Sequence, residues 1–379
     1  MNIAINARVL NERHGGPARY TMNVIRELAA IDRTNRYHIL MYDIRDFDFQ
    51  LPSNFVVSVV RFRSKLFFDY IFIPFFSWRK RIDIFLFPKN TFSPLVRGKK
   101  IPVYHDIVYF EDFNFREFKY FDNLHHRIMI PVAARFSWID LTVSDFTASR
   151  MKSLLNIRQE KIRVVKEGVE DHFRRISDKK RLARVKKTFN LKVPFFFYAG
   201  SLSPRKNMLN VIRAFTRIKD SIPHVIYFTG GDSWLDSEVY DMIRDGGLED
   251  RIVRLGYIGE EDLVAMYNLA DCYLYPSLYE GFGLPILEAQ ACGCPVITSN
   301  VSSCPEVAGE GALYVNPHDA EDIAWAMLSI VKDTNLKKKL IKAGLQNCRQ
   351  YTWEKTARAI YRLFLENNTG KERTNENRG

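Results

Sequence analysis

Two glutamates, Glu280 and Glu288, stand eight positions apart around a short loop that contains Gly281 and Gly283. We expect a helix to begin near Leu284, directly after a strand. The first turn of a helix has unpaired backbone N–H groups and a positive dipole end that attract anions, and glycine lets a ligand approach the backbone closely. Ionised carboxylates only accept hydrogen bonds, so they suit the paired hydroxyls of a sugar or ribose. The pattern fits a nucleotide-sugar; a glycine turn with two surface glutamates is the alternative.

Two adjacent cations, Arg205 and Lys206, lie between a predicted strand and a predicted helix. Cations at the amino end of a helix are disfavoured by the helix dipole, by about 0.3–1 kcal/mol each. Their presence therefore indicates a bound anion, and diphosphate is the natural candidate, because arginine offers a planar fork and lysine a point charge. A solvated pair on a protein of net charge +12 is the alternative.

The first half of the chain contributes two further candidate groups. Gly15 and Gly16 follow the first predicted strand and precede Arg19. They would let a phosphate or an acceptor approach the backbone, although a flexible surface loop explains them equally well. His105 and Asp106 end another strand, where a polar pair could contact substrate; a structural histidine is the alternative.

Other known nucleotide and metal signatures are weak or missing. The chain has no Walker A sequence, and Ile286 stands where a dinucleotide-binding fingerprint beginning at Gly281 would need glycine or alanine. This disfavours a hydride-transfer enzyme. Asp46 and Asp48 form an Asp-x-Asp that could bind Mg²⁺ or Mn²⁺ between phosphates. We interpret it as incidental and predict no catalytic metal.

The elements that must position these groups alternate between short apolar strands and amphipathic helices, and the series runs twice. This alternation predicts parallel sheets covered on both faces, in which ligands sit beyond the carboxyl ends of the strands. The predicted strands of the first half are Asn2–Asn6, Tyr37–Tyr42, Phe55–Val60, Ile82–Phe87, Ile101–Tyr104, Ile139–Val143 and Arg163–Val165. Those of the second half are Phe195–Tyr198, Val225–Thr229, Ile252–Leu255, Cys272–Tyr275, Val296–Thr298 and Ala312–Val315.

The repeat of the series predicts two domains in the 379 residues. We place the first at residues 1–168 together with a C-terminal helix at 352–366, and the second at 169–351. A polar, charge-rich stretch at 166–192 would hold the linker. Residues 367–379 lack large apolar side chains and are predicted to be a disordered tail.

Charge and cysteine content narrow the cellular setting. Most of the excess positive charge lies in the first half, which suits phosphate groups or an acidic membrane surface; we expect no nucleic-acid partner, and solubility alone is the alternative. The five cysteines are odd in number and contain no Cys-x-x-Cys pair, which favours a reducing compartment. The chain begins without a signal-peptide pattern and has no run of about 20 apolar residues. We therefore expect a cytoplasmic protein.

One apolar segment, Leu66–Trp78, is flanked by basic residues on both sides. It is too short to span a bilayer. It could lie on the inner face of the cell membrane as a peripheral anchor attracted by anionic lipid, or it could be a core helix of the first domain. Its basic flanks are Arg61, Arg63 and Lys65, and Arg79, Lys80 and Arg81.

Taken together, these segments resemble the family 4 retaining glycosyltransferases of GT-B fold, also called group 1, over nearly the whole chain. The resemblance is closest to the subset that adds mannose or related sugars to bacterial surface polysaccharides such as lipopolysaccharide. The specific part is the Glu-x7-Glu motif that ends at Glu288, followed by Ala289, Ala291, Gly293, Pro295 and Val296. Equally typical are Ser203-Pro204-Arg205-Lys206-Asn207, the first loop Gly-Gly-Pro-Ala-Arg-Tyr, and the segment Leu141–Leu155.

The resemblance implies an α/β GT-B architecture, with two Rossmann-like parallel-sheet domains facing each other across a cleft. It also implies roles for individual residues. Donor diphosphate would be held by Arg205 and Lys206, sugar and phosphate by Glu280 and the amides of Phe282, Gly283 and Leu284, and the ribose hydroxyls by Glu288. On the acceptor side, His105 would contact the transferring sugar, and Gly15, Gly16 and Arg19 would form the acceptor and phosphate loop.

The activity implied is metal-independent, retaining transfer of a hexose, best matched by mannose, from a nucleotide-diphosphate sugar to a saccharide or polyprenyl-linked acceptor. A GT-B-type nucleotide-sugar epimerase and a non-catalytic nucleotide-sugar-binding subunit remain alternatives. One segment departs from the family: a Pro-Asn-Gly-Val-Asp linker is replaced by Val165-Lys166-Glu167-Gly168-Val169-Glu170. The linker assignment stands, but its hinge geometry does not follow from the family.

Overall fold

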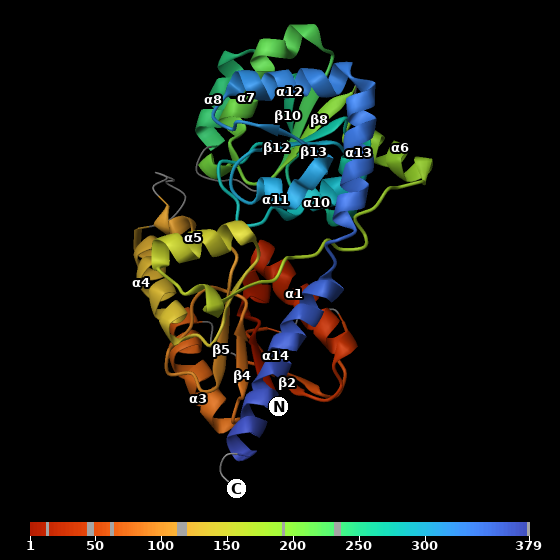
Figure 1. Ribbon diagram of the computed structural model, residues 1–379. Coiled ribbons are helices and arrows are strands. Elements are labelled where there is room, and N and C mark those ends of the chain that lie inside the picture. The colour runs from red at the N-terminus through yellow and green to blue at the C-terminus, as the bar shows by residue number, and fades with distance from the viewer. Residues whose placement is uncertain are drawn as a thin grey trace. The chain divides into compact units, whose positions relative to one another are not determined.

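The computed structural model divides into two compact units, each described here by itself (Figure 1). It describes residues 1–12, 15–43, 49–60, 64–111, 120–191, 194–230 and 236–376. Unit 1 comprises Met1–Glu111, Tyr120–Gly168 and Thr352–Gly379, and unit 2 contains Val169–Tyr351. The chain thus changes unit after Gly168 and after Tyr351, which are the two positions expected from the sequence.

Unit 1 is built on a seven-stranded sheet with the order β3-β2-β1-β4-β5-β6-β7, in which every pairing is parallel. Strand order reverses between the neighbouring strands β1 and β4, which is the position where open α/β sheets hold ligands. The strands are β1 (Asn2–Asn6), β2 (Arg36–Met41), β3 (Phe55–Val59), β4 (Ile84–Phe87), β5 (Lys99–Tyr104), β6 (Asp140–Thr142) and β7 (Ile162–Val164).

Unit 2 repeats this plan with a six-stranded parallel sheet of order β10-β9-β8-β11-β12-β13, which reverses beside β8. Every strand predicted from the sequence is present in the two sheets, with ends within two residues of those predicted. The strands are β8 (Phe195–Ala199), β9 (Val225–Thr229), β10 (Ile252–Arg254), β11 (Cys272–Tyr275), β12 (Val296–Ser299) and β13 (Ala312–Val315).

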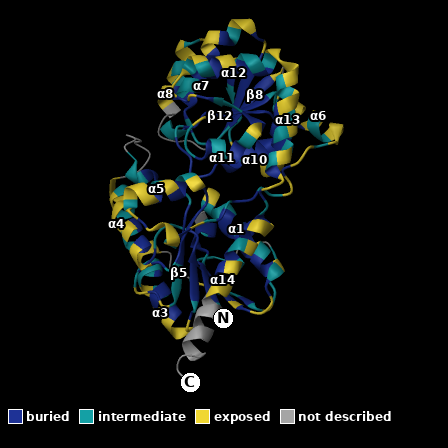
Figure 2. Ribbon diagram, viewed as in Figure 1, coloured by how far each residue is buried: buried dark blue, intermediate teal, exposed yellow. Residues whose placement is uncertain are grey.

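Helices cover both sheets, and burial explains why the strands read as continuous apolar runs. All residues of β4, with sequence IFLF, and of β11, with sequence CYLY, are buried, as expected for strands packed on both faces. Figure 2 shows buried strands at the centre of each unit and exposed residues on the outer faces of the helices. The carboxyl ends of these strands therefore carry the loops that can reach a ligand.

The helical elements of unit 1 are η1 (Arg8–Glu12), α1 (Gly16–Ile31), α2 (Lys65–Phe67), the π-helical turn η2 (Phe68–Phe72), α3 (Ile73–Arg79), η3 (Val108–Phe110), α4 (Tyr120–Phe136), α5 (Asp145–Leu155), η4 (Gln159–Lys161) and α14 (Trp353–Glu376). Those of unit 2 are α6 (Lys179–Thr188), η5 (Pro204–Lys206), α7 (Met208–Ile218), η6 (Lys219–Ser221), α8 (Asp236–Asp245), α9 (Glu260–Leu269), α10 (Leu284–Ala291), α11 (Cys304–Ala308), η7 (Gly309–Gly311), α12 (Ala320–Lys332) and α13 (Thr334–Cys348).

Helix α14 returns the chain to unit 1, where it packs against α1. The helix extends to Glu376, so the predicted disordered tail from residue 367 is wrong for the backbone of 367–376. Adding residues to a helix that already exists costs far less than starting one. A polar sequence can therefore continue the turns begun by Trp353.

The predicted linker at 166–192 is also shorter than expected, because it contains α6. The side chain of Asp178 caps this helix by accepting hydrogen bonds from the amides of Lys180 and Arg181. Helix α13, which the sequence analysis did not predict, is capped in the same way by Asp333. A capping aspartate is a local start signal, but in both cases it was hidden within a run of charged residues.

The apolar segment Leu66–Trp78 is helical and runs through α2, η2 and α3. Phe68, Ile73 and Phe76 are buried in the core of unit 1. The other face, with Leu66, Ile71, Phe75 and Trp78, is exposed. The core-helix interpretation therefore describes one face only. In the part of the chain that the structure describes, no helix is both long and apolar enough to cross a membrane.

Candidate functional site

In unit 2 the two predicted cations lie in a single tight turn after β8. Arg205 and Lys206 belong to η5, and Asn207 follows with a left-handed backbone (φ +66°) before α7 begins. The Asn207 amide group donates hydrogen bonds to the carbonyls of Pro276 and Pro317, at 2.8 and 2.7 Å. The sequence had suggested that the cations lie at the amino end of this helix. In the structure they precede α7 and do not occupy its first turn.

Both cations bind the carboxylate of Glu280. Lys206 Nζ lies 2.7 Å from one carboxylate oxygen, and Arg205 Nη1 lies 3.0 Å from the other. Arg205 Nη1 also donates to the carbonyl of Tyr279 at 3.0 Å. Glu280 is only 6% exposed. The sequence predicted an anion beside these cations, and in the described structure this protein's own carboxylate takes that place.

Charge pairing controls the protonation of this cluster. Burial alone would raise the pKa of Glu280, but the charges of Lys206 and Arg205 outweigh it and lower the pKa to about 2. Burial lowers the pKa of Lys206, and Glu280 acts in the opposite direction. Lys206 Nζ also donates to the hydroxyl of Tyr275 at 2.8 Å. Glu280 is therefore ionised at neutral pH, and both of its carboxylate oxygens can accept hydrogen bonds.

The conformation of the glycine loop that follows Glu280 is fixed by a positive φ angle and by hydrogen bonds from one serine. Gly283 has φ +112°, and a Cβ there would lie 3.1 Å from Ile286 Cδ1. Ser303 Oγ donates to the carbonyls of Glu280 and Phe282, at 3.0 and 2.7 Å. Because these carbonyls turn toward Ser303, the loop is fixed in shape. Ser303 belongs to no motif that the sequence analysis used.

Helix α10 begins at Leu284, as predicted, and Gly283 at its start provides no side-chain cap. An uncapped first turn offers backbone N–H groups to an anion. The amides of Phe282, Gly283 and Leu284 therefore belong to the segment where the sequence placed a phosphate. Phe282 and Leu284 are themselves buried, so the segment contributes its backbone more than its side chains.

Glu288 lies inside α10 and is 2% exposed. One of its carboxylate oxygens accepts a hydrogen bond of 3.1 Å from the hydroxyl of Tyr267, in α9. Burying a carboxylate is costly unless hydrogen bonds compensate, so Tyr267 stabilises Glu288 in place. Sequence spacing had identified Glu288 as an acceptor; its partner Tyr267 was not predicted.

In unit 1, His105 follows β5 and has a partner on each ring nitrogen. Nδ1 lies 3.0 Å from a carboxylate oxygen of Glu167, and Nε2 lies 3.0 Å from the carbonyl of Pro88. Both partners carry acceptor oxygens, so each ring nitrogen of His105 has an acceptor beside it. The ring of Tyr20 packs edge-on against His105, at 5.0 Å between centroids. Glu167 lies in the segment where this chain departs from the linker sequence of the family. That departure is the sequence signal that could have identified Glu167.

A pocket of about 260 Å³ lies at the carboxyl ends of three neighbouring strands of unit 1. His105 and Asp106, for which the sequence predicts contact with substrate, both line it. Gly15, with φ +126°, and Gly16 are exposed and directly precede the lining residue Pro17. The remaining lining residues are Arg8, Lys65, Lys89, Asn90, Thr91, Tyr109 and His126; Arg19 is not among them.

Arg8 is the most deeply buried cation of this pocket, and its guanidinium lies 3.3 Å from the carboxylate of Asp69. No sequence motif pointed to this pair. Among the residues that the structure describes, no group of three or more His, Cys, Asp and Glu side chains could hold a metal ion. Asp46 and Asp48, the Asp-x-Asp of the sequence, lie outside the described residues.

The site of unit 2 lies in a segment with a recognisable family profile. Residues 179–347 match the profile described as "Glycosyl transferases group 1". These residues form a glycosyl transferases group 1 domain. The domain includes Arg205, Lys206, Glu280 and Glu288, so all side chains of the unit 2 site come from the part of the chain that the profile covers.

Several curated relatives are named as mannosyltransferases. The chain is 33% identical over 216 residues to the O-antigen chain mannosyltransferase B of Escherichia coli, covering 56% of this chain and 57% of that protein. It is 29% identical over 239 residues to the O-antigen chain mannosyltransferase RfbU of Salmonella typhimurium, covering 62% of each. Against the Escherichia coli serotype-specific mannosyltransferase WbdA, the match covers 69% of this chain and 33% of that protein, at 28% identity. The match thus spans 57% of the length of mannosyltransferase B and 33% of the length of WbdA.

Solved structures match the whole fold. The sucrose-phosphate synthase of Thermosynechococcus elongatus superposes with a TM-score of 0.77 at 20% identity, covering 98% of this chain and 100% of that one. The Anabaena protein HepE in complex with UDP-glucose gives 0.76 at 17% identity, covering 97% and 100%. At these identities the likeness concerns the fold alone, and it identifies the two parallel-sheet units as those of the GT-B fold.

Proposed function

We propose that this protein transfers a hexose, mannose in our assignment, from a nucleotide-diphosphate sugar to a saccharide or lipid-linked saccharide acceptor in cell-surface polysaccharide synthesis. The observation that carries the proposal is the buried cluster of Arg205, Lys206 and Glu280 beside the uncapped start of α10. This cluster lies within the glycosyl transferases group 1 domain. The relatives named as O-antigen mannosyltransferases support the choice of sugar and of pathway.

The proposed chemistry of unit 2 is charge stabilisation. As the bond between the sugar and the diphosphate breaks, negative charge grows on the leaving oxygen. Fixed cations and helix amides that are already oriented stabilise such charge without reorganisation. Arg205, Lys206 and the first amides of α10 would thus supply what a divalent metal supplies in other transferases. We accordingly propose a metal-independent reaction.

We propose that the anomeric configuration is retained by attack from the face that the diphosphate leaves. The acceptor oxygen forms the new bond to the sugar carbon while the carbon–oxygen bond to the diphosphate breaks, and the acceptor proton passes to the leaving phosphate. The cluster around Glu280 supports this route, because both oxygens of its carboxylate are bound to cations and are poorly suited to act as a nucleophile. His105 would contact the transferring sugar.

The exposed face of α2, η2 and α3 supports a peripheral position on an anionic membrane at the cytoplasmic side, where a lipid-linked acceptor would lie. Tyr70 in η2 shares a hydrogen bond of 3.0 Å with His125 in α4, so the two helical elements adjoin. Large apolar side chains on these elements are exposed, and basic residues flank them. The exposed apolar residues are Leu66, Ile71, Phe75, Trp78, Tyr120, Phe121, Leu124, Ile128 and Phe136.

Vesicle sedimentation tests the membrane part of the proposal. Binding should occur with anionic vesicles, decrease with salt and be absent with neutral vesicles. The double variant Phe75→Ser, Trp78→Ser should reduce binding to the anionic vesicles. Trp325→Ser is the matched control, because Trp325 is an exposed tryptophan on α12 of unit 2. Binding that does not depend on lipid composition would contradict a membrane role.

The test of the activity is an incubation of guanosine- and uridine-diphosphate sugars with polyprenyl-linked saccharide acceptors. A new glycosidic product with the donor's anomeric configuration would support the proposal. An isomerised donor would instead indicate an epimerase, and donor binding without turnover would indicate a binding subunit. The same assay in excess EDTA tests metal independence.

A further inference from the structure

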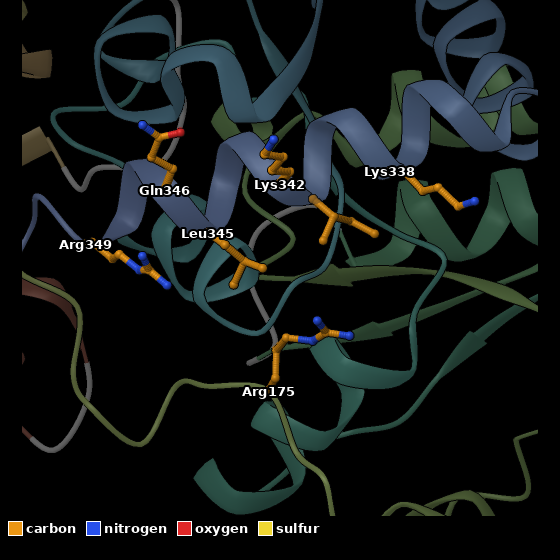
Figure 3. A pocket seen from close by; sticks show the side chains of 7 residues that line it. Arg175, Lys338, Lys342, Leu345, Gln346 and Arg349 are labelled. Atoms are coloured by element: carbon orange, nitrogen blue, oxygen red, sulfur yellow. The ribbon is translucent and has the colours of Figure 1, made fainter.

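A second hollow in unit 2, of about 630 Å³, lies along one side of α13 (Figure 3). Its lining residues come from successive turns at the end of α13 and from Arg175, in the segment that precedes α6; in this view Leu345 and Arg349 extend toward Arg175. None of its lining residues belongs to the cluster around Glu280. They are Arg175, Lys338, Ile341, Lys342, Leu345, Gln346 and Arg349.

Four of these seven lining residues are cations, and none is a carboxylate: Arg175, Lys338, Lys342 and Arg349. In the part of the chain that the structure describes, none of the four forms a salt bridge, although Lys337 on the same helix pairs with Asp271. Positive charges that face one hollow without a counter-charge repel one another. An anion placed among them would therefore be bound favourably.

The floor of the hollow is apolar. Ile341 and Leu345 are half-buried there, and the aliphatic stems of the surrounding lysines and arginines extend the apolar surface. The stem of Arg175 lies over Gly293, where a Cβ would come within 3.2 Å of it. Gly293 has φ +73° and leaves the space that Arg175 fills, so this cation is held at the edge of the hollow.

The hollow continues into a neighbouring one of about 410 Å³, because Lys338 and Ile341 line both. Ile330, Val331 and Pro194 add apolar surface there. His224 also lines it; this residue is 4% exposed, and among the described residues its Nδ1 has no hydrogen-bond partner. The result is an elongated groove with an apolar floor and a cationic end. Its other end is also lined by the paired Asp271 and Lys337, and by His224, whose Nδ1 has no partner among the described residues.

We propose that this groove binds a single anionic amphiphile, with a phosphate headgroup among Arg175, Lys338, Lys342 and Arg349 and a hydrocarbon chain along Ile341 and Leu345. Charge complementarity selects the headgroup, and burial of apolar surface selects the chain. An acyl or prenyl phosphate has both parts on one molecule, whereas inorganic phosphate lacks the chain and a neutral detergent lacks the charge. The groove is independent of the residues on which the proposed transferase activity rests.

Titration calorimetry with dodecyl phosphate, below its micelle concentration, tests the proposal on the full-length protein. Dodecyl phosphate should bind at least about tenfold more tightly than inorganic phosphate, because burying even a few methylene groups contributes more than this factor. Dodecyl maltoside should not bind. Arg175→Ala and Lys342→Ala should each lower the affinity for dodecyl phosphate about tenfold, which is the usual scale for one charged hydrogen bond. Leu345→Ala should lower the affinity for dodecyl phosphate and leave the affinity for inorganic phosphate unchanged.

Two controls localise the binding. Lys339→Ala removes an exposed lysine of the same helix that does not line the groove, so it should bind like the parent protein. Arg213→Ala removes an exposed arginine of α7 that does not line the groove, and it should also have no effect. Thermal unfolding confirms that each variant is folded. Equal binding of dodecyl maltoside, equal weakening in Lys339→Ala, or tighter binding of a hexaglutamate peptide would overturn the proposal.

Discussion

The candidate groups of unit 2 and of unit 1 acquire their partners in different ways. In unit 2, Arg205, Lys206 and Glu280 come from two neighbouring strand-to-helix connections, and both cations pair with the one carboxylate. In unit 1, His105 pairs with Glu167, which is one residue from the point where the chain leaves the unit. The first site is complete within one domain; the second depends on a residue of the crossing segment.

The crossing segment of unit 1 is tightly packed. A Cβ on Gly168 would collide with the backbone of Thr352 and Trp353, at the start of α14. Trp353 in turn packs edge-on against Tyr20, which contacts His105. Both chain crossings are thus connected to His105 through direct contacts. We infer that the unit 1 site is sensitive to the backbone at the crossing, whereas the unit 2 site is sensitive to its own charges.

The largest effect is expected for Glu280→Ala. The motif alone predicts a loss of turnover rather than of stability. The two ion pairs add a loss of stability, because removing one partner of a buried ion pair leaves an uncompensated charge, at about 3–5 kcal/mol. Chemical denaturation and initial-rate assays on the same preparation measure both effects. A variant with the parent's stability and rate would remove Glu280 from the site.

Removal of either cation should mainly slow turnover. Losing one preorganised donor typically costs about 10²–10³-fold in rate. For Arg205→Ala and Lys206→Ala we expect that loss in kcat more than in donor affinity, because the charge grows in the transition state. Arg213→Ala, an exposed arginine on α7, is the control. Activity that disappears in EDTA and returns with Mn²⁺ would contradict the role of these cations and would direct attention to Asp46 and Asp48.

Acid should weaken the unit 2 cluster in a defined window. The folded pKa of Glu280, about 2, lies below its ordinary value of 4.5. Its contribution is therefore fully present above pH 4.5 and is lost as the pH falls from 4.5 toward 2, at a cost of about 3 kcal/mol. Melting temperatures of the parent and of Glu280→Gln should converge over this window. Parallel curves would show that Glu280 is not stabilised by its charge.

A smaller effect is expected at Glu288. In Glu288→Gln an amide donor replaces one acceptor oxygen, and losing a charged hydrogen bond typically costs about 1.5–3 kcal/mol of donor affinity. The fold should persist, since the two side chains have similar shapes. Tyr267→Phe removes the hydroxyl that binds Glu288 and should weaken donor binding less. Calorimetric titration with the nucleotide-sugar measures both, and unchanged affinity in Glu288→Gln would refute the ribose assignment.

The smallest effects concern His105 and test the contrast between the units. His105→Ala should lower transfer while nucleotide binding stays near that of the parent protein, because the nucleotide is assigned to unit 2. Glu167→Gln, which keeps the shape but removes the charge beside His105, should lower kcat about tenfold, the scale of one charged hydrogen bond. Equal losses of transfer and of nucleotide binding would instead identify a structural histidine.

The strands were determined by the sequence because their signal is local. A run such as Phe195–Ala199 is short, aromatic-rich and apolar at every position, as expected for a strand buried on both faces. Helices α6 and α13 escaped prediction because their start signals, Asp178 and Asp333, stand among other charged residues. The C-terminal end of α14 escaped because continuation of a helix leaves no mark on a polar sequence.

For the sites, residue type and spacing alone selected Arg205, Lys206, Glu280 and Glu288. Only the tertiary structure decided which of them meet. Arg205 and Glu280 are 75 positions apart in the chain, and they come together because β8 pairs with β11, which aligns the loops that follow both strands. His105 and Glu167 are 62 positions apart. Sequence periodicity reports on neighbours within a turn or a strand, so contacts made by the order of strands in a sheet leave no local trace.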